Sequence, residues 1–220
     1  MNIRQMLVSS SKYSIKCPYS MNPRYITIHN TANDASANNE VSYMINNSSE
    51  TSFHYAVDDK EAVQGIPESR NAWHCGDGGS GTGNRHSIGI EICYSKSGGN
   101  RFVQAEKNAA YLTATLLKKY GWGIDRVKKH QDWSGKYCPH RTLDMGWTRF
   151  VNMVKAELNK LNAPAQPSTP PTSNNIYRVI VNGTQIGAYG NVDNICNVVK
   201  EQVKKGVSKI EVVKKWQCYV

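Results

Sequence analysis

Apolar and polar side chains alternate in three short segments of the first hundred residues. In residues 25–29, 53–57 and 88–92, apolar side chains occupy every second position. This period of two predicts β-strands that are buried on one face. The third segment carries Glu91 on the face opposite its three isoleucines. In the first segment, the face opposite the isoleucines ends on His29.

Apolar residues at helical spacing predict three helices between and after these strands. The helices cover about 35–46, 103–120 and 147–161, and Gly121 ends the second. The glycine-rich stretch 76–83 predicts a surface loop. Because strands alternate with helices, we expect an α/β domain with a mixed central sheet flanked by helices.

The last 45 residues predict a second, smaller unit. A strand over 177–181 leads to Asn182-Gly183, which is a strong hairpin signal, and to a partner strand over 185–189. Asn191 can cap a helix that Gly206 ends, and 210–213 is the last predicted strand. The order ββαβ predicts a small α+β domain. No repeat of fixed period is present.

A proline-rich stretch separates the two predicted units. Residues 162–175 contain four of the eight prolines and no charged or aromatic side chain, which is typical of an extended linker. The predicted organisation is therefore a domain over 1–161, a linker over 162–175 and a second domain over 176–220.

The chain is basic, with a net charge of +10, and we expect an anionic polymer as its partner. The charge divides into +6 for 1–161 and +4 for 176–220. The basic residues are scattered, without a helix-turn-helix or an arginine-rich arm, which argues against nucleic acid.

No apolar run reaches the roughly 18 residues of a membrane span, so we expect no membrane insertion. Residues 6–8 are too short for a secretory signal, so we expect synthesis in the cytoplasm without one.

Histidine and cysteine residues offer one candidate metal site. His130 and Cys138 flank a loop, eight residues apart, and His29 ends a predicted strand. Zinc takes such nitrogen and sulfur ligands, and catalytic sites use three protein ligands. Spacing alone leaves open that each is an ordinary structural residue.

Five ordered segments add a family resemblance. They resemble the zinc-dependent N-acetylmuramoyl-L-alanine amidases of the type 2 family, which includes phage endolysins and bacterial autolysins and shares its fold with animal peptidoglycan recognition proteins. The similarity covers nearly all of residues 1–161. The segments are YITIHNT (25–31), SFHYAVD (52–58), AWH (72–74), SIGIEI (87–92) and HQDW through KYCP (130–139).

The resemblance implies a reaction and roles for five residues. Members of the family cleave the amide between the lactyl group of N-acetylmuramic acid and L-alanine of the stem peptide. His29, His130 and Cys138 correspond to the zinc ligands, and Glu91 to the catalytic carboxylate, which acts as general base on a zinc-activated water. Lys136, two residues before Cys138, is expected to stabilise the oxyanion.

Each assignment has a structural alternative. Glu91 could be a buried structural carboxylate, and Lys136 a solvated loop lysine. Trp73 and His74 correspond to a segment expected to line the peptide groove, although His74 could equally be structural. Some members of the family carry tyrosine where this chain has Phe53, which places more weight on Glu91. Members of the fold that lack a cysteine at position 138 bind without cutting, so Cys138 favours an enzyme over a peptidoglycan-binding protein.

The tail resembles, more loosely, the wall-binding modules of phage amidases. We expect it to hold the enzyme on peptidoglycan and anionic polymers of a Gram-positive wall, unless it merely packs on the first domain. The favoured interpretation is a phage or prophage endolysin that reaches the wall after holin-type release and lyses the cell; a host autolysin is the alternative. The sequence does not indicate an oligomeric state. Candidate polymer contacts, or merely a solvated face, are Lys204, Lys205, Lys209, Lys214 and Lys215.

Overall fold

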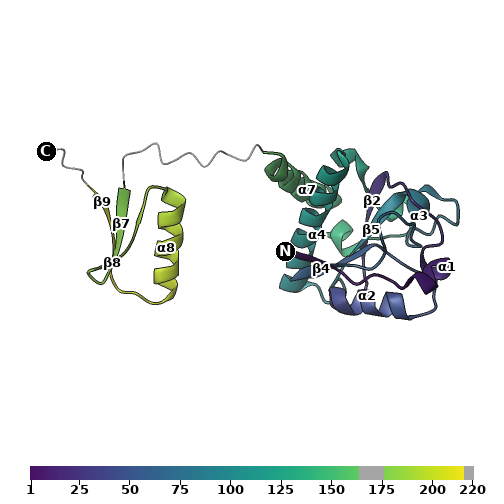
Figure 1. Cartoon of the computed structure of the whole chain (residues 1–220), viewed down its shortest axis with the longest axis horizontal. Coiled ribbons are helices and arrows are strands. Elements are labelled where there is room, and N and C mark those ends of the chain that lie inside the picture. Colours follow the sequence, from purple (N-terminus) through teal and green to yellow (C-terminus); the bar gives the residue numbers. More distant parts are fainter. Residues whose placement is uncertain (164–175, 216–220) are drawn as a thin grey trace. The chain divides into compact units, whose positions relative to one another are not determined.

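The chain forms two compact units, Met1–Ala163 and Pro164–Val220 (Figure 1). A computed structural model describes residues 1–163 and 176–215. Most of the predicted linker, residues 164–175, lies outside the described residues. The two units are therefore considered separately.

The first unit is built on a six-stranded mixed sheet. The strand order is β1-β4-β3-β5-β2-β6, and all neighbouring strands are parallel except the pair β3 and β4. The predicted mixed central sheet is confirmed. Its strands are β1 (Asn2–Gln5), β2 (Tyr25–Asn30), β3 (Tyr55–Val57), β4 (Glu61–Gln64), β5 (Ser87–Ile92) and β6 (Val127–Lys129).

Helices flank this sheet, and the longest, α4, packs against both α7 and β5. Helix α4 ends at Gly121, whose φ of 67° is a left-handed value that glycine adopts without strain. No helix among the described residues is long and apolar enough to span a bilayer. The helices are α1 (Tyr13–Lys16), α2 (Ala37–Asn46), α3 (Thr82–His86), α4 (Gly99–Tyr120), α5 (Gln131–Ser134), α6 (His140–Asp144) and α7 (Trp147–Asn162), with 3-10 turns at Ser10–Lys12 and Ile124–Arg126.

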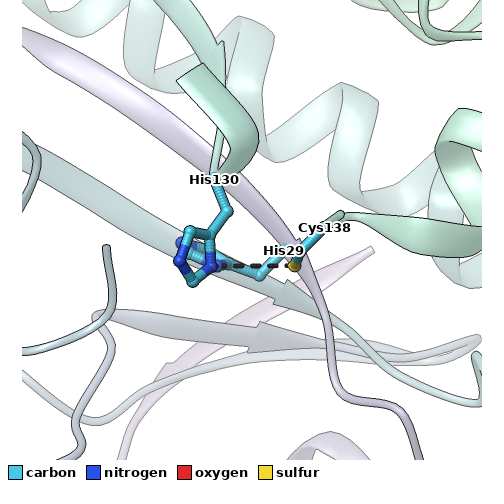
Figure 2. A group of neighbouring side chains, drawn as sticks. All are labelled: His29, His130 and Cys138. Carbon is cyan, nitrogen blue, oxygen red and sulfur yellow. Dashed lines mark hydrogen bonds between the residues drawn. The ribbon is translucent and has the colours of Figure 1, made fainter. Parts of the chain in front are cut away.

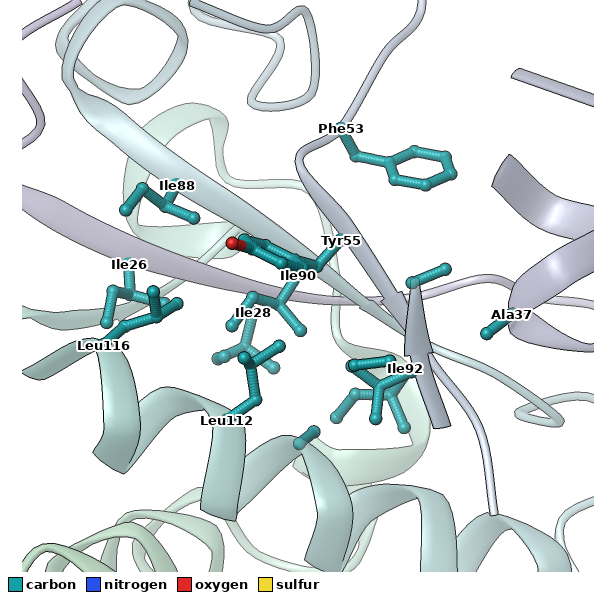
Figure 3. Packing of buried hydrophobic residues seen from close by; sticks show 14 of the residues in the cluster. Ile26, Ile28, Ala37, Phe53, Tyr55, Ile88, Ile90, Ile92, Leu112 and Leu116 are labelled. Carbon is teal, nitrogen blue, oxygen red and sulfur yellow. The ribbon is translucent and has the colours of Figure 1, made fainter. Parts of the chain in front are cut away.

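The core lies between the isoleucine face of the sheet and helix α4. Figure 3 shows Ile28 beside Leu112 and Ile26 beside Leu116, and all four side chains are buried. Burying each such side chain contributes about 1.5–3 kcal/mol. Because side chains alternate along a strand, this packing forces the other residues of β2 and β5 to the opposite face. That face carries His29 and Glu91.

The sequence did not predict three of the six strands, β1, β4 and β6, or the short helices α1, α3, α5 and α6, and it misplaced the start of α4. Strand β1 is a mostly exposed edge strand that Arg4 ties to Glu61 of β4, and β6 has only three residues, so neither leaves a periodic pattern. Helix α3 begins at Thr82, inside the predicted loop, because the carboxylate of Asp77 accepts hydrogen bonds from backbone N–H groups at the start of that helix. Helix α4 starts at Gly99 rather than at 103.

The second unit has the predicted order ββαβ. Its antiparallel sheet has the order β8-β7-β9. Asn182 and Gly183 form the hairpin turn with φ of 48° and 84°, and the Asn191 side chain caps α8. The elements are β7 (Ile176–Val181), β8 (Thr184–Tyr189), α8 (Val192–Lys204) and β9 (Ile210–Lys215).

Candidate metal centre

Three side chains that could hold a metal ion meet on the polar face of the first unit. His29 lies near the end of β2, His130 lies between β6 and α5, and Cys138 lies between α5 and α6. Their donor atoms all fall within 4.8 Å of one another, and Figure 2 shows the side chains converging. His29 Nδ1 lies 3.0 Å from His130 Nδ1 and 3.8 Å from Cys138 Sγ.

These distances suit a tetrahedral ion. Ligand bonds of about 2.05 Å to nitrogen and 2.3 Å to sulfur place nitrogens about 3.3 Å apart, and nitrogen about 3.6 Å from sulfur. The His29–His130 and His29–Cys138 separations of 3.0 and 3.8 Å lie close to these values. The three residues therefore fit a cation with two imidazoles and one thiolate.

The protonation of the donors is set by burial. Desolvation, followed by the repulsion that His29 would meet from protonated His74 and His130 and from Lys136, lowers the pKa of His29 far below its usual range. Desolvation also lowers the pKa of His130 and, with the charge of Glu91, raises the pKa of Cys138 to about 11. The two histidines are therefore neutral and ready to ligate. The cysteine becomes a thiolate at neutral pH when a cation is bound beside it.

Glu91 stands next to His29 because β5 and β2 are parallel neighbours in register. Its Oε1 lies 4.0 Å from His29 Nδ1, and its buried Oε2 has no hydrogen-bond partner among the described residues. Burial, reinforced by the charge of Glu40 and opposed by that of Lys136, raises the pKa of Glu91 to about 8. A buried carboxyl that lacks a hydrogen-bond partner on one oxygen, next to three side chains able to bind a metal, is suited to exchange a proton with a ligand.

A groove opens beside the group of metal-donor side chains His29, His130 and Cys138, which we call the donor cluster. It has a volume of about 390 Å³, and Glu91 and Lys136 both line it. Lys136 is exposed, so its ammonium can reach a ligand in the groove. Phe53, Glu40 and Tyr43 form part of the wall. Glu40 lies in the predicted helix 35–46, where no motif distinguishes it from an ordinary surface glutamate. Sequence reasoning therefore gave it no role.

A second pocket, of about 530 Å³, lies along the glycine-rich loop and includes Trp73, Gly76 and Asn84 in its lining. The indole N–H of Trp73 donates to the carbonyl of Ile15, which fixes the ring. His130 borders this side, since a Cβ at Gly76 would lie 3.6 Å from its Nε2.

His74, grouped with Trp73 in the sequence, is placed differently. It is 8% exposed and is absent from the lining of both pockets. Its Nδ1 contacts Nε2 of His29, the ring nitrogen that does not face Cys138. Sequence reasoning gave no role to the adjacent Cys75, which forms a second close group of donors with His29 and His74. The His-Cys pair directly after Trp73 was the available signal. His54 is a buried structural residue that accepts from the N–H of Gly89 and hydrogen-bonds to the carbonyl of Arg70.

Comparison with known proteins bears on the first unit. The family model described as N-acetylmuramoyl-L-alanine amidase (Amidase_2) matches residues 19–141. The chain is 66% identical over 163 residues, 74% of its length, to the N-acetylmuramoyl-L-alanine amidase CwlA of Bacillus subtilis strain 168. It is 63% identical over 158 residues, 71% of its length, to XlyB, an amidase of the same organism. It spans 60% of the length of CwlA and 50% of that of XlyB.

Solved structures give the same result. The structure of PlyL superposes with a TM-score of 0.70 at 59% identity, covering 71% of this chain and 99% of PlyL. The catalytic domain of XlyA superposes with a TM-score of 0.64 at 40% identity, covering 70% of this chain and 99% of that domain. The fold of the first unit is thus shared with both.

Proposed function

Because this chain belongs to the Amidase_2 family of N-acetylmuramoyl-L-alanine amidases, we propose that it hydrolyses the amide between the lactyl group of N-acetylmuramic acid and L-alanine of the stem peptide. The observation that carries the proposal is the cluster of His29, His130 and Cys138 with Glu91 Oε1 4.0 Å from His29 Nδ1, at the wall of an open groove. A buried thiol and two neutral imidazoles select a borderline-soft cation, and zinc is the ion that we propose.

When bound, zinc supplies Lewis-acid polarisation of the substrate carbonyl and lowers the pKa of a water to about 7. His29, His130 and Cys138 would hold the ion from three different segments of the chain. Because β2 is paired on both sides, with β5 and with β6, we expect the position of His29 to be rigid.

Glu91 is proposed as the general base and acid. Its carboxylate takes a proton from the attacking water as the new C–O bond forms. The same carboxyl then gives that proton to the nitrogen of L-alanine as the C–N bond breaks, so the amine leaves neutral. Its raised pKa, about 8, suits a group that must both accept and release a proton near neutral pH.

Lys136 is proposed to stabilise the oxygen that becomes negative during the attack. Its exposed ammonium shares the groove with Glu91. Removing one such donor commonly costs about 3 kcal/mol of transition-state stabilisation. Trp73 is assigned to substrate contact from its place in the second pocket, on the His130 side of the cluster.

The second unit is proposed to bind the wall. The predicted charge of +4 over 176–220 suits anionic polymers. Two of its candidate lysines are paired within the unit, Lys204 with Glu201 and Lys209 with Glu211, each at 3.0 Å. We propose a lytic role at a Gram-positive wall, consistent with the similarity to amidases of Bacillus and to Endolysin PlyTW of Staphylococcus phage Twort.

Digestion of purified peptidoglycan followed by mass spectrometry tests the reaction. A newly exposed amino group on L-alanine is expected. New reducing sugar ends, or cuts within the peptide, would contradict the amidase assignment. Dye release from labelled walls is expected to stop after chelation and to return with zinc, so unchanged release from the metal-free chain would exclude the zinc mechanism.

A further inference from the structure

His74 lies directly behind His29, on the side away from Cys138. His29 presents its Nδ1 to His130 and Cys138, and its Nε2 lies 2.9 Å from His74 Nδ1. The other nitrogen of His74, Nε2, lies 3.3 Å from the carbonyl oxygen of Ser87. All of these rings are buried.

The hydrogen bonds leave one consistent arrangement of protons. A carbonyl oxygen only accepts, so His74 Nε2 carries the proton and donates to Ser87. In a neutral ring, Nδ1 of His74 is then an acceptor. The partner 2.9 Å away, His29 Nε2, must be the donor. The Sγ of Cys75, 3.1 Å from the same Nδ1, is also a potential donor and agrees with this assignment.

A fixed proton on Nε2 of His29 leaves Nδ1 of that ring unprotonated, with its lone pair on the side of His130 and Cys138. Building on the proposed zinc site, we propose that His74 is a positioning residue. It holds His29 in the tautomer and ring orientation that ligate a metal through Nδ1. Partners of this kind behind a metal-ligating histidine fix its tautomer and raise its basicity.

The same segment borders the second candidate histidine ligand. The Nδ1 of His130 faces His29, and its Nε2 lies beside Gly76, the residue after Cys75. The segment from His74 to Gly76 therefore lies against both candidate histidine ligands.

Two buried contacts fix this segment in turn. The side-chain oxygen of Asn84 accepts from the backbone N–H groups of His74 and Cys75, at 2.9 and 2.8 Å. Gly89 of β5 lets the His74 ring approach the strand closely, because a Cβ there would lie 2.8 Å from His74 Nδ1. Contacts that close essentially do not occur, so a side chain at position 89 displaces the ring.

The first test measures zinc affinity by chelator competition. His74→Leu removes the acceptor, and its zinc affinity is expected to fall about 10- to 100-fold. In His74→Asn the amide oxygen can occupy the place of Nδ1, so most of the affinity is expected to return. Gly89→Ala keeps His74 but displaces its ring, and a loss is expected there as well. It also serves as the test if His74→Leu does not fold.

The matched control is His54→Gln. His54 is another buried histidine, with its ring 5.9 Å from that of His74. Within the part of the chain that the structure describes, its ring bonds to the backbone of Arg70 and Gly89 and to none of His29, His130 and Cys138. Its zinc affinity is expected to stay within about twofold of the native value. Equal losses in the His54 and His74 variants would overturn the proposal, since His74 would then act only through general stability.

Nitrogen-15 NMR of the histidine rings reads the tautomer directly. The native chain is expected to show His29 protonated at Nε2, and His74→Leu is expected to show a mixture. A folded His74→Leu chain with native zinc affinity would overturn the positioning role, as would two zinc ions per native chain with only the second lost in that variant. A native chain that binds no zinc would instead refute the proposed function on which this inference rests.

Discussion

The two units differ in how much of each is buried. The first encloses a sheet between helices, and the rings of His29, His74 and His54 lie inside it with at most 8% exposure. In the second, Val179 is the one residue that is fully buried among 176–214, the positions whose burial the structure describes. A deep core fixes side chains to within fractions of an ångström, which metal ligation and proton transfer require. The adhesion to a polymer that we propose for the second unit has no such requirement, so a shallow core would suffice for it.

The distribution of histidine follows the same division. All six lie in the first unit, and three of them line up as His130, His29 and His74. The second unit carries no histidine and presents lysines instead. The proposed chemistry of the first unit and the proposed adhesion of the second are therefore expected to respond to different perturbations, and each prediction below tests that separation.

The largest effect is expected from Glu91→Gln. The amide has nearly the same shape but cannot accept the proton of the attacking water, so turnover is expected to fall about 10²- to 10⁴-fold. Wall hydrolysis is measured together with zinc content and wall binding. The last two are expected to stay unchanged, because the second unit is intact. Near-native turnover would remove Glu91 from the mechanism, and lost wall binding would break the separation between the units.

Truncating one buried side chain in each unit should show that the first unit has the more extensive core, through a larger loss of unfolding free energy. Leu112→Ala opens a cavity against the isoleucine face and is expected to cost about 2–5 kcal/mol. Val179→Ala is expected to cost about 1–2 kcal/mol, since less apolar volume is removed. Denaturant unfolding followed by hydrogen exchange of each unit measures both. A larger loss from Val179→Ala would show that the second unit is the better packed of the two.

Acid should destabilise the first unit selectively, because its buried histidines are neutral. Burial lowers the pKa of His54 from 6.5 to about 4, so the unfolded chain takes up the proton first. The contribution of neutral His54 to the free energy of unfolding is complete above about pH 6.5. It is lost as the pH falls toward 4, by about 3 kcal/mol. Burial moves the pKa values of His29, His74 and His130 in the same direction.

Thermal melts of the metal-free chain between pH 7 and 4 measure this loss. The midpoint temperature of unfolding of the first unit is expected to fall steeply as the pH is lowered. In His54→Gln this temperature is expected to fall less per pH unit. Hydrogen exchange is expected to show the second unit little affected between pH 6.5 and 5, since it has no histidine. A first unit that melts at the same temperature throughout would show that these histidines are not held neutral.

Much of the fold could be predicted from sequence because periodicity reports burial. The isoleucines of β2 and β5 predicted both strands and, by alternation, the polar face that carries His29 and Glu91. Short or exposed strands such as β1 and β6 leave no such signal. The support of His29 by His74 was also beyond prediction, because it depends on a contact between residues 45 positions apart and on the absence of a side chain at Gly89.

The smallest effect is expected from removing residues 164–220. Turnover on a soluble muropeptide should stay within about twofold, because the donors and Glu91 all belong to the first unit. Affinity for intact walls should fall about tenfold or more, since a second attachment point raises the effective concentration of enzyme at its polymer. Pull-down on whole walls at rising salt measures this loss. The native chain should lose binding with salt more steeply than the truncated one, because counterions screen the lysines of the second unit. Equal wall binding by both chains would mean that the first unit alone holds the enzyme on its substrate.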